Sequence, residues 1–192
     1  FHASGKADLA GFGVGPFGFL LEVNDTRINL ARDLIATVDG ELLFQREGSA
    51  QTLKGEMTVK RAIYDKRVDL RVMAVEWMQK TEKTFSEETP IIGATKMNIH
   101  LSGRENLWID NNIAKIPLEA DLFLKGTIDR PLLIGRIEIP RGLIYFRKNE
   151  FKVTSGSIEF LDPQKINPRF DLKAKTVVKT PNSKVSLNKD YE

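Results

Sequence analysis

The chain has 192 residues, of which 41% are hydrophobic and 29% charged, an ordinary balance for one large or two small globular domains. The net charge of +3 comes from 29 basic and 26 acidic residues, which are interleaved, so no basic block predicts a nucleic-acid partner. The absence of cysteine excludes disulfides and thiolate metal sites. The chain begins with Phe1 and its apolar runs are too short to cross a bilayer. We therefore expect a piece of a longer protein, with any targeting signal or membrane anchor outside it.

Alternation of apolar and polar residues with a period of two runs through most of the chain and predicts β-strands. The predicted strands, in chain order, cover residues 34–44, 53–59, 68–74, 97–101, 107–109, 116–128, 133–139, 151–153, 158–160, 170–178 and 185–187. The strand at 133–139 is followed by a bend at Arg141–Gly142 and a further apolar stretch. The strands at 151–153 and 158–160 are expected to form a short hairpin around Ser155–Gly156.

Residues that favour turns are expected where these strands stop. They are Asp39–Gly40, Ser102–Gly103, Asp110–Asn112, Asp129–Pro131, Asp162–Pro163 and Asn167–Pro168. Evidence for helix is confined to 71–85 and to the ambiguous stretch 29–38. The polar stretch 79–90 predicts a surface loop.

The sequence LKGEMTVKRAI, which starts at Leu53, is echoed 80 residues later by LIGRIEIPRGL, which starts at Leu133. Gly55 aligns with Gly135 in this echo. A repeated all-β unit predicts an elongated stack in which each unit buries its apolar face against its neighbours. We therefore expect one elongated β-structure over 1–192, which the echo divides into repeat units at about 1–78 and 91–192, separated by the polar loop.

Residue types that could carry chemistry are present but scattered. Gly13–Gly18 matches GxGxxG, but Pro16 lies inside it and no helical pattern follows, so a glycine-rich bend is favoured over a dinucleotide site. His2 and His100 lack partners at metal-ligand spacing, which favours a solvent-facing His100. Asp110–Asn112 lacks the other ligands of a calcium loop, and the paired Glu87 and Glu88 fall in the polar loop. The sequence thus predicts no enzyme, no metal site and no cofactor.

The one-sided strands leave two architectures open. Two apolar faces can meet and form the closed core of a sandwich. Alternatively, the sheet can curl without closing, and its apolar face then lines a trough that needs an apolar ligand, because large exposed apolar patches are costly in water.

A series of marks in the second half carries a family resemblance. Lys125–Thr127 leads to Arg130–Pro131, and the following marks are Gly135, Arg141–Gly142, Phe151, Val153, Gly156, Ile158, Phe160, Asn167–Pro168, Phe170, Leu172 and Ala174. In this order and spacing, residues 116–179 resemble the C-terminal domain of the TamB family, the inner-membrane component of the translocation and assembly module. This family is related to AsmA-like and bridge-like lipid-transfer proteins. Residues 94–115 resemble it as well, and the resemblance is weaker over 1–71.

The resemblance implies an all-β fold: an elongated, curled antiparallel or mixed sheet that forms an open half-pipe, or β-taco, with a hydrophobic inner groove and little helix. It also implies a full-length protein that is anchored in the inner membrane of a Gram-negative bacterium and spans the periplasm. Membrane contact would be made by parts outside this chain. The implied partners are phospholipid and an Omp85-type, TamA-like outer-membrane barrel protein, and no catalytic residue is implied.

From this resemblance and the hydrophobic pattern we expect a set of apolar side chains to line the groove: Met57, Val59, Leu122, Leu124, Ile128, Leu133, Ile137, Ile139, Leu143, Phe151, Val153, Ile158, Phe160, Phe170 and Leu172. The first functional hypothesis is a non-enzymatic conduit for phospholipid acyl chains that supports outer-membrane biogenesis. The second is a protein-assembly module that binds outer-membrane protein strands or the barrel partner by β-strand addition. The third is a closed structural domain that only spans distance.

Overall fold

The computed structural model describes residues 2–10, 13–31, 34–69, 92–147 and 149–176, and every structural statement below concerns these. These residues are 80% strand and form one curved sheet of ten strands, a shape consistent with a half-pipe. This confirms the predicted fold class. The expected helix at 71–85, the loop at 79–90 and any strand beyond 176 lie outside the described residues.

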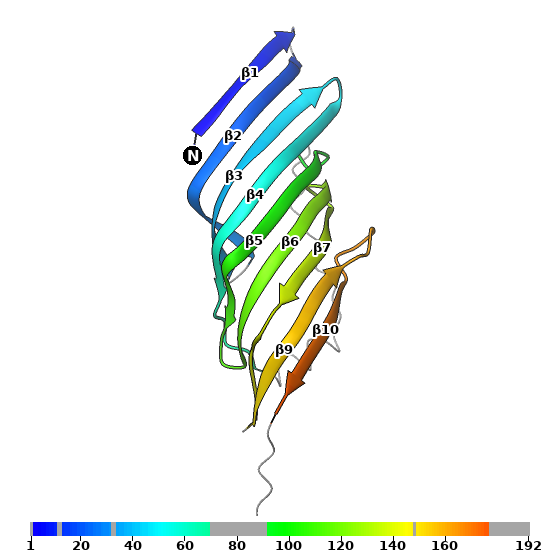
Figure 1. Cartoon of the computed structure of the whole chain (residues 1–192). Helices are drawn as coiled ribbons and strands as arrows, with labels where there is room; N and C mark the ends of the chain where they lie inside the picture. The colour runs from blue at the N-terminus through cyan, green and yellow to red at the C-terminus, as the bar shows by residue number, and fades with distance from the viewer. Residues whose placement is uncertain (1, 11–12, 32–33, 70–91, 148, 177–192) are drawn as a thin grey trace, which may run out of the picture.

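Apart from β8, the strands follow one another along the long axis of the molecule, from β1 in blue to β10 in orange (Figure 1). Their bounds are β1 His2–Ala10, β2 Gly13–Ala31, β3 Leu34–Glu47, β4 Ala50–Tyr64, β5 Lys96–Asp110, β6 Ala114–Thr127, β7 Pro131–Ile139, β8 Gly142–Phe146, β9 Asn149–Phe160 and β10 Pro168–Lys175.

Neighbours in the sheet are also neighbours in the chain, apart from one local branch. The order is β1-β2-β3-β4-β5-β6-β7-β9-β10, and β8 continues the line of β7 by pairing with both β6 and β9. All pairs are antiparallel except β4–β5, which is parallel. Because the sheet is continuous across β4–β5, it does not separate into two bodies at this point, and the division into two repeat units stays a prediction.

Several predicted turns are wrong, because the strands are longer than the pattern indicated. Asp39–Gly40 lies within β3 and Ser102–Gly103 within β5. A Cβ atom at Gly40 would collide with the carbonyl oxygen of Glu56, so this glycine serves close approach of two strands and not a turn. Gly13–Gly18 opens strand β2, which contradicts both the glycine-rich bend and the dinucleotide site. Of the strand predicted at 68–74, residues 68 and 69 belong to no strand, and 70–74 lie outside the described residues.

A line of irregularities crosses the sheet from β2 to β9, and we call it the crease. Extra residues interrupt the ladders at Asn24–Asp25 in β2, Lys60 in β4 and Arg104–Asn106 in β5. The line continues through Pro140–Arg141, between β7 and β8, and Thr154–Ser155 in β9. Bulges bend a strand and increase its local twist, so their alignment across successive strands folds the sheet along one line.

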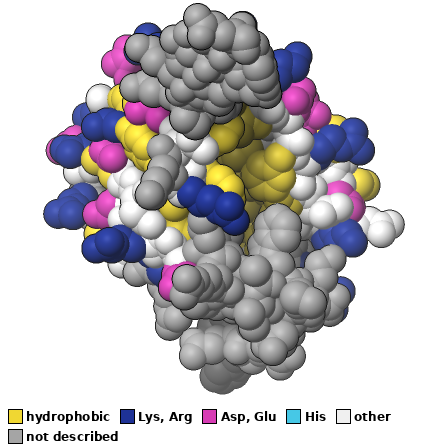
Figure 2. Space-filling model, turned by 90° about the horizontal axis from the view of Figure 1, so that it is seen from below, with side chains coloured by type: hydrophobic (Ala, Val, Ile, Leu, Met, Phe, Trp, Pro, Cys, Tyr) yellow, Lys and Arg dark blue, Asp and Glu magenta, His cyan; other side chains and the backbone are white. Residues whose placement is uncertain are grey.

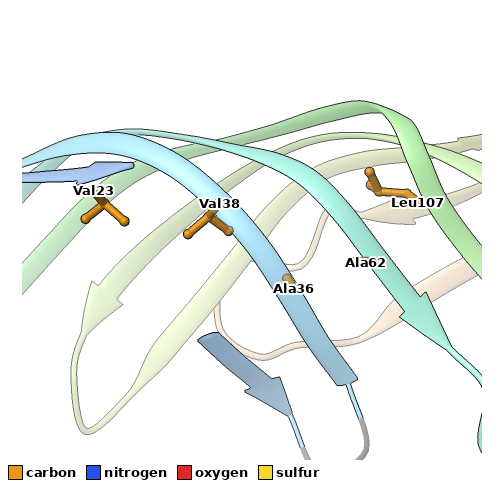
Figure 3. Packing of buried hydrophobic residues seen from close by; sticks show 5 residues of the cluster. All are labelled: Val23, Ala36, Val38, Ala62 and Leu107. Atoms are coloured by element: carbon orange, nitrogen blue, oxygen red, sulfur yellow. The ribbon is translucent and has the colours of Figure 1, made fainter. Parts of the chain in front are cut away.

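Because the sheet folds along the crease, it has a concave and a convex face. We call the face that carries Val23 and Val38 the inner face and the opposite one the outer face. In Figure 3, the side chains of Val23, Ala36, Val38 and Leu107 lie on the concave side of the arching strands. The two clusters of buried apolar residues follow the crease: Val23, Ala36, Val38, Ala62 and Leu107 in one, and Ala114, Ile116, Ile139 and Val153 in the other.

Candidate functional site

Two continuous rows of apolar or glycine residues cross the inner face at right angles to the strands. Because directly paired residues project on the same side of a sheet, the ladder registers define these rows. The first runs from β2 to β10 through Val23, Gly40, Met57, Leu101, Leu122, Gly135, Phe160 and Pro168. The second runs from β2 to β7 through Leu21, Leu42, Gly55, Ile99, Leu124 and Leu133. No charged or polar side chain interrupts either row.

Exposure on the inner face changes with distance from the crease. Val38 is 1% exposed and Val153 is 3% exposed, so the floor of the trough is closed to water. Phe19, nearer the ends of the strands, is 41% exposed. Figure 2 looks along the long axis and shows a recess whose visible surface is largely hydrophobic, with charged side chains gathered on its flanks. The part of the inner face visible in this view is therefore recessed and largely apolar, which is consistent with a half-pipe.

The structure brings most of the expected groove residues to this inner face. Those placed there by the ladders are Met57, Val59, Leu122, Leu124, Leu133, Ile137, Ile139, Phe151, Val153, Ile158, Phe160, Phe170 and Leu172. Phe170 is 65% exposed, because β10 is the last strand of the described sheet. Ile128 lies outside the ladders, in a turn where its backbone N–H donates to the carbonyl oxygen of Thr95 at 3.2 Å.

Leu143 is a correction, because it lies on the outer face. Its ladder partners are Lys115 and Lys152, whereas Ile144 pairs with Ala114 and Phe151 of the inner face. The physical reason is the break at Pro140–Arg141. The inner positions are odd-numbered up to Ile139 and even-numbered from Gly142, so the alternation shifts by one residue at the crease.

The predicted hairpin around Ser155–Gly156 is also wrong, and for the same reason. Residues 149–160 form the single strand β9. The odd-numbered Phe151 and Val153 and the even-numbered Ile158 and Phe160 share the inner face, because Thr154 is an extra residue opposite Lys173 and Ala174 of β10. A change of parity along the sequence therefore marked a bulge and not a turn.

Sequence reasoning missed much of the floor, namely Val23, Ala36, Val38, Ala62, Leu107, Ala114 and Ile116. The alternation from Leu34 to Phe44 did identify Ala36 and Val38 as one side of a strand. The missing signal was the position of the crease, which buries the residues beside it, small alanines as well as branched side chains.

Charged groups meet on the outer face of the crease. Lys60 Nζ lies 3.0 Å from Asp25 Oδ1 and 3.3 Å from Asp39 Oδ2. The backbone N–H of Asp25 donates to Asp39 Oδ1 at 2.6 Å, and this bond is the main reason that the pKa of Asp39 is lowered, with Lys60 adding to it. Hydrogen bonds to Asp25 and Asp39 raise the pKa of Lys60. The three groups thus bridge the bulges of β2 and β4 at the solvent-facing surface.

The outer face offers no catalytic constellation in the described part of the chain. His100 stacks on Phe123 with ring centroids 4.6 Å apart and lies 2.8 Å from Asp121 Oδ1, so its side chain is partnered as well as partly exposed. No group of three histidine or acidic residues suited to a metal ion occurs among the described residues. Nor does this part contain a helix that meets the length and hydropathy of a membrane span.

Comparison with protein families gives a match to the TamB C-terminal domain over residues 1–192. No curated protein matches the chain. The match therefore extends beyond residues 116–179, which carried the resemblance in sequence. It includes residues 1–71, where the resemblance is weaker. Because it covers the whole chain, the chain belongs to the TamB family of Gram-negative envelope proteins, which is not a family of enzymes and has a role in outer-membrane assembly.

Proposed function

We propose that the inner face carries the acyl chains of phospholipids between the inner and outer membranes, as a non-enzymatic module in the periplasm. The observation that carries this proposal is the unbroken pair of apolar rows across the concave face. The row from Val23 to Pro168 crosses eight strands of the sheet, and neighbouring strands are about 4.8 Å apart. The rows thus follow the direction in which the strands succeed one another, along the long axis.

The energetics of an acyl chain fit such a surface. Each methylene group that leaves an apolar environment for water costs about 0.8 kcal/mol, so a polar interruption would act as a barrier to sliding. Within the rows, the glycines Gly40, Gly55 and Gly135 replace a side chain with bare backbone but introduce no charge. Movement along the trough would therefore exchange one apolar contact for another of similar energy. Charged headgroups would stay in water at the open side.

The test is photo-crosslinking from single positions in the protein expressed in Gram-negative cells. Leu124 and Phe123 are adjacent in β6 and project onto opposite faces, so they form a matched pair. We expect a photo-reactive residue at Leu124, Ile139 or Phe160 to form phospholipid adducts and the same residue at Phe123 to form none. Equal lipid labelling at Leu124 and Phe123, or no lipid at any inner position, would overturn the conduit.

A second candidate is a protein-assembly module, which binds an outer-membrane protein strand or an Omp85-type barrel partner by β-addition. It is favoured by one observation: Phe170 and Leu172 of the last described strand are 65% and 43% exposed. An exposed apolar edge strand is a template for pairing with another chain. Protein adducts from positions 170 and 172, in the absence of lipid adducts from position 124, would favour this candidate over the first.

A further inference from the structure

Beyond the crease, toward the start of β3 and the end of β4, apolar residues occur on both faces of the sheet. On the outer face, Ile35, Ile63, Trp108 and Pro117 form one row across β3, β4, β5 and β6. Ile35 is 46% exposed. On the other side of the crease, the outer row across the same four strands contains Glu41, Glu56, His100 and Phe123. An outer surface that stays in water would not need this change from a mainly polar to a wholly apolar row, so the row indicates a contact surface.

A cationic row borders these apolar residues on the crease side. Arg27, Thr37 and Arg61 are direct ladder partners on β2, β3 and β4, and all three project outward because Ala36 and Val38 project inward. Two strand spacings separate the arginines, about 10 Å between backbones, so both flexible side chains can reach one anion over the Thr37 hydroxyl. Neither arginine has a carboxylate within salt-bridge distance among the described residues.

The two rows enclose an open hollow of about 520 Å³, lined by Arg27, Ile35, Thr37, Arg61, Ile63 and Asp65. A second hollow of about 360 Å³ adjoins it through Arg61 and Ile63, and Trp108 contributes to its wall. Two acidic residues also face these hollows. Asp110 is paired with Lys115 at 3.8 Å, which leaves the single carboxylate of Asp65 against the two arginines.

We propose that Arg27, Thr37 and Arg61 bind the phosphate of an anionic phospholipid at a membrane surface, with Ile35, Ile63 and Trp108 in contact with the apolar part of the same lipid layer. Charge complementarity selects this occupant: two arginines that form no ion pair within the described part of the chain offer planar donors suited to phosphate oxygens. Tryptophan and aliphatic side chains beside cationic groups are the combination that favours the interface of an anionic bilayer. The site is on the outer face and does not depend on lipid binding in the trough.

The experiment measures binding of the protein to phosphatidylcholine vesicles with and without 30% phosphatidylglycerol, at fixed salt. In a Trp77→Phe background, Trp108 is the one remaining tryptophan, and its emission should shift to the blue on binding. We expect Arg27→Gln/Arg61→Gln to weaken binding to the anionic vesicles about thirtyfold. The matched control is Arg130→Gln/Arg169→Gln, which removes the same charge from exposed positions elsewhere and should change binding less than about threefold.

Thr37→Val keeps the net charge and tests for phosphate recognition beyond general attraction; we expect it to weaken binding several-fold.

Inorganic phosphate, compared with chloride at equal ionic strength, separates the sources of the anion: strong competition would mean that free phosphate occupies the site and would overturn the lipid assignment. Equal losses in the two double variants, or no vesicle binding with Arg27- and Arg61-dependent capture of an acidic protein, would overturn it too. A Leu124→Arg variant, which obstructs the trough, should leave vesicle binding intact, so failure here is distinguishable from failure of the conduit.

Discussion

Gly55 in β4 and Gly135 in β7 occupy the same position in two hairpins that lie 80 residues apart in the chain. Gly55 pairs with Leu42, and Gly135 pairs with Leu122. The φ angles of the two glycines are 153° and 129°, and a Cβ atom at either would collide with the carbonyl oxygen of the residue before its partner, Glu41 or Asp121. The echo in the sequence is therefore a repeated hairpin with a repeated close contact.

Substitution of these glycines tests that equivalence. We expect Gly135→Ala to lower the free energy of unfolding by about 1–3 kcal/mol, since the backbone conformation and the approach of Asp121 both exclude a methyl group. Gly55→Ala should cost a similar amount. Urea denaturation followed by circular dichroism measures both.

Gly18 provides the control for this pair. It also lies within a strand, but nothing lies within 4 Å of the position where its Cβ would be. Gly18→Ala should leave the stability within about 0.5 kcal/mol of the original. A loss at Gly18 as large as that at Gly135 would contradict the steric explanation.

We expect the substitution of threonine by valine to have different effects on stability at two positions: Thr52, near the start of β4, and Thr95, just before β5. Thr95 is fully buried, and its hydroxyl donates to Gln51 Oε1 at 2.9 Å. Its neighbour in space, Thr52, has a buried hydroxyl without a hydrogen-bond partner. Thr95→Val should cost about 1 kcal/mol and Thr52→Val should be neutral or stabilising, because valine keeps the shape and removes the hydroxyl. Destabilisation by both, measured by thermal unfolding, would contradict this account.

The Lys60, Asp25 and Asp39 network predicts a pH dependence of stability. The pKa of Asp39 is lowered in the folded state from 3.8, so its contribution is present above about pH 4 and disappears as the pH falls through the lower folded value. The pKa of Lys60 is raised from 10.5, so its contribution is present below that value and disappears as the pH rises through the higher folded one. We expect Lys60→Met to reduce the urea midpoint slightly at pH 7 and to have no effect at acid pH, below the folded pKa of Asp39.

Lys54 is the control for this network, as an exposed lysine of β4 without an ion pair among the described residues. Lys54→Met should show no comparable pH-dependent difference. Because the network is exposed, 0.5 M salt should also diminish the effect of Lys60→Met. A difference that persists at acid pH and high salt would mean that packing of the lysine stem, and not charge, stabilises the crease.

The sequence was sufficient to predict strands, their apolar sides and the all-β class, because alternation with a period of two depends only on which side chains face water. The sequence was not sufficient to locate the bulges that form the crease. Thr154 and Lys60 each insert one residue into an otherwise regular ladder, and a one-residue insertion looks the same in sequence as the end of a strand. For this reason Ser155–Gly156 was predicted as a turn, although the chain passes straight through it.

The echo relates the bulge of one hairpin to that of the other. The register between Ile35 and Ile63, beyond the crease in β3 and β4, is reproduced by the register between Lys115 and Leu143 in β6 and β8. Lys60 therefore has its counterpart in Pro140, and Ile63, like Leu143, projects outward. Once the ladder of β3 and β4 shows the bulge at Lys60, the echo places the matching break at Pro140 and Leu143 on the outer face; neither bulge is visible in the sequence alone.

The outward position of Leu143 leads to the last prediction, which uses adjacent residues of β8 as a matched pair. Leu143 lies between Lys115 and Lys152 on the outer face, so Leu143→Glu should change stability by no more than about 0.5 kcal/mol, with attraction to the two lysines offsetting the lost apolar contact. Ile144 packs against the buried cluster of Ile116, Ile139 and Val153. A carboxylate there has no cationic partner on the inner face, so Ile144→Glu should cost about 2 kcal/mol or more. Urea denaturation of both variants measures the difference, and a larger loss at position 143 than at 144 would mean that the face assignment beyond the crease is reversed.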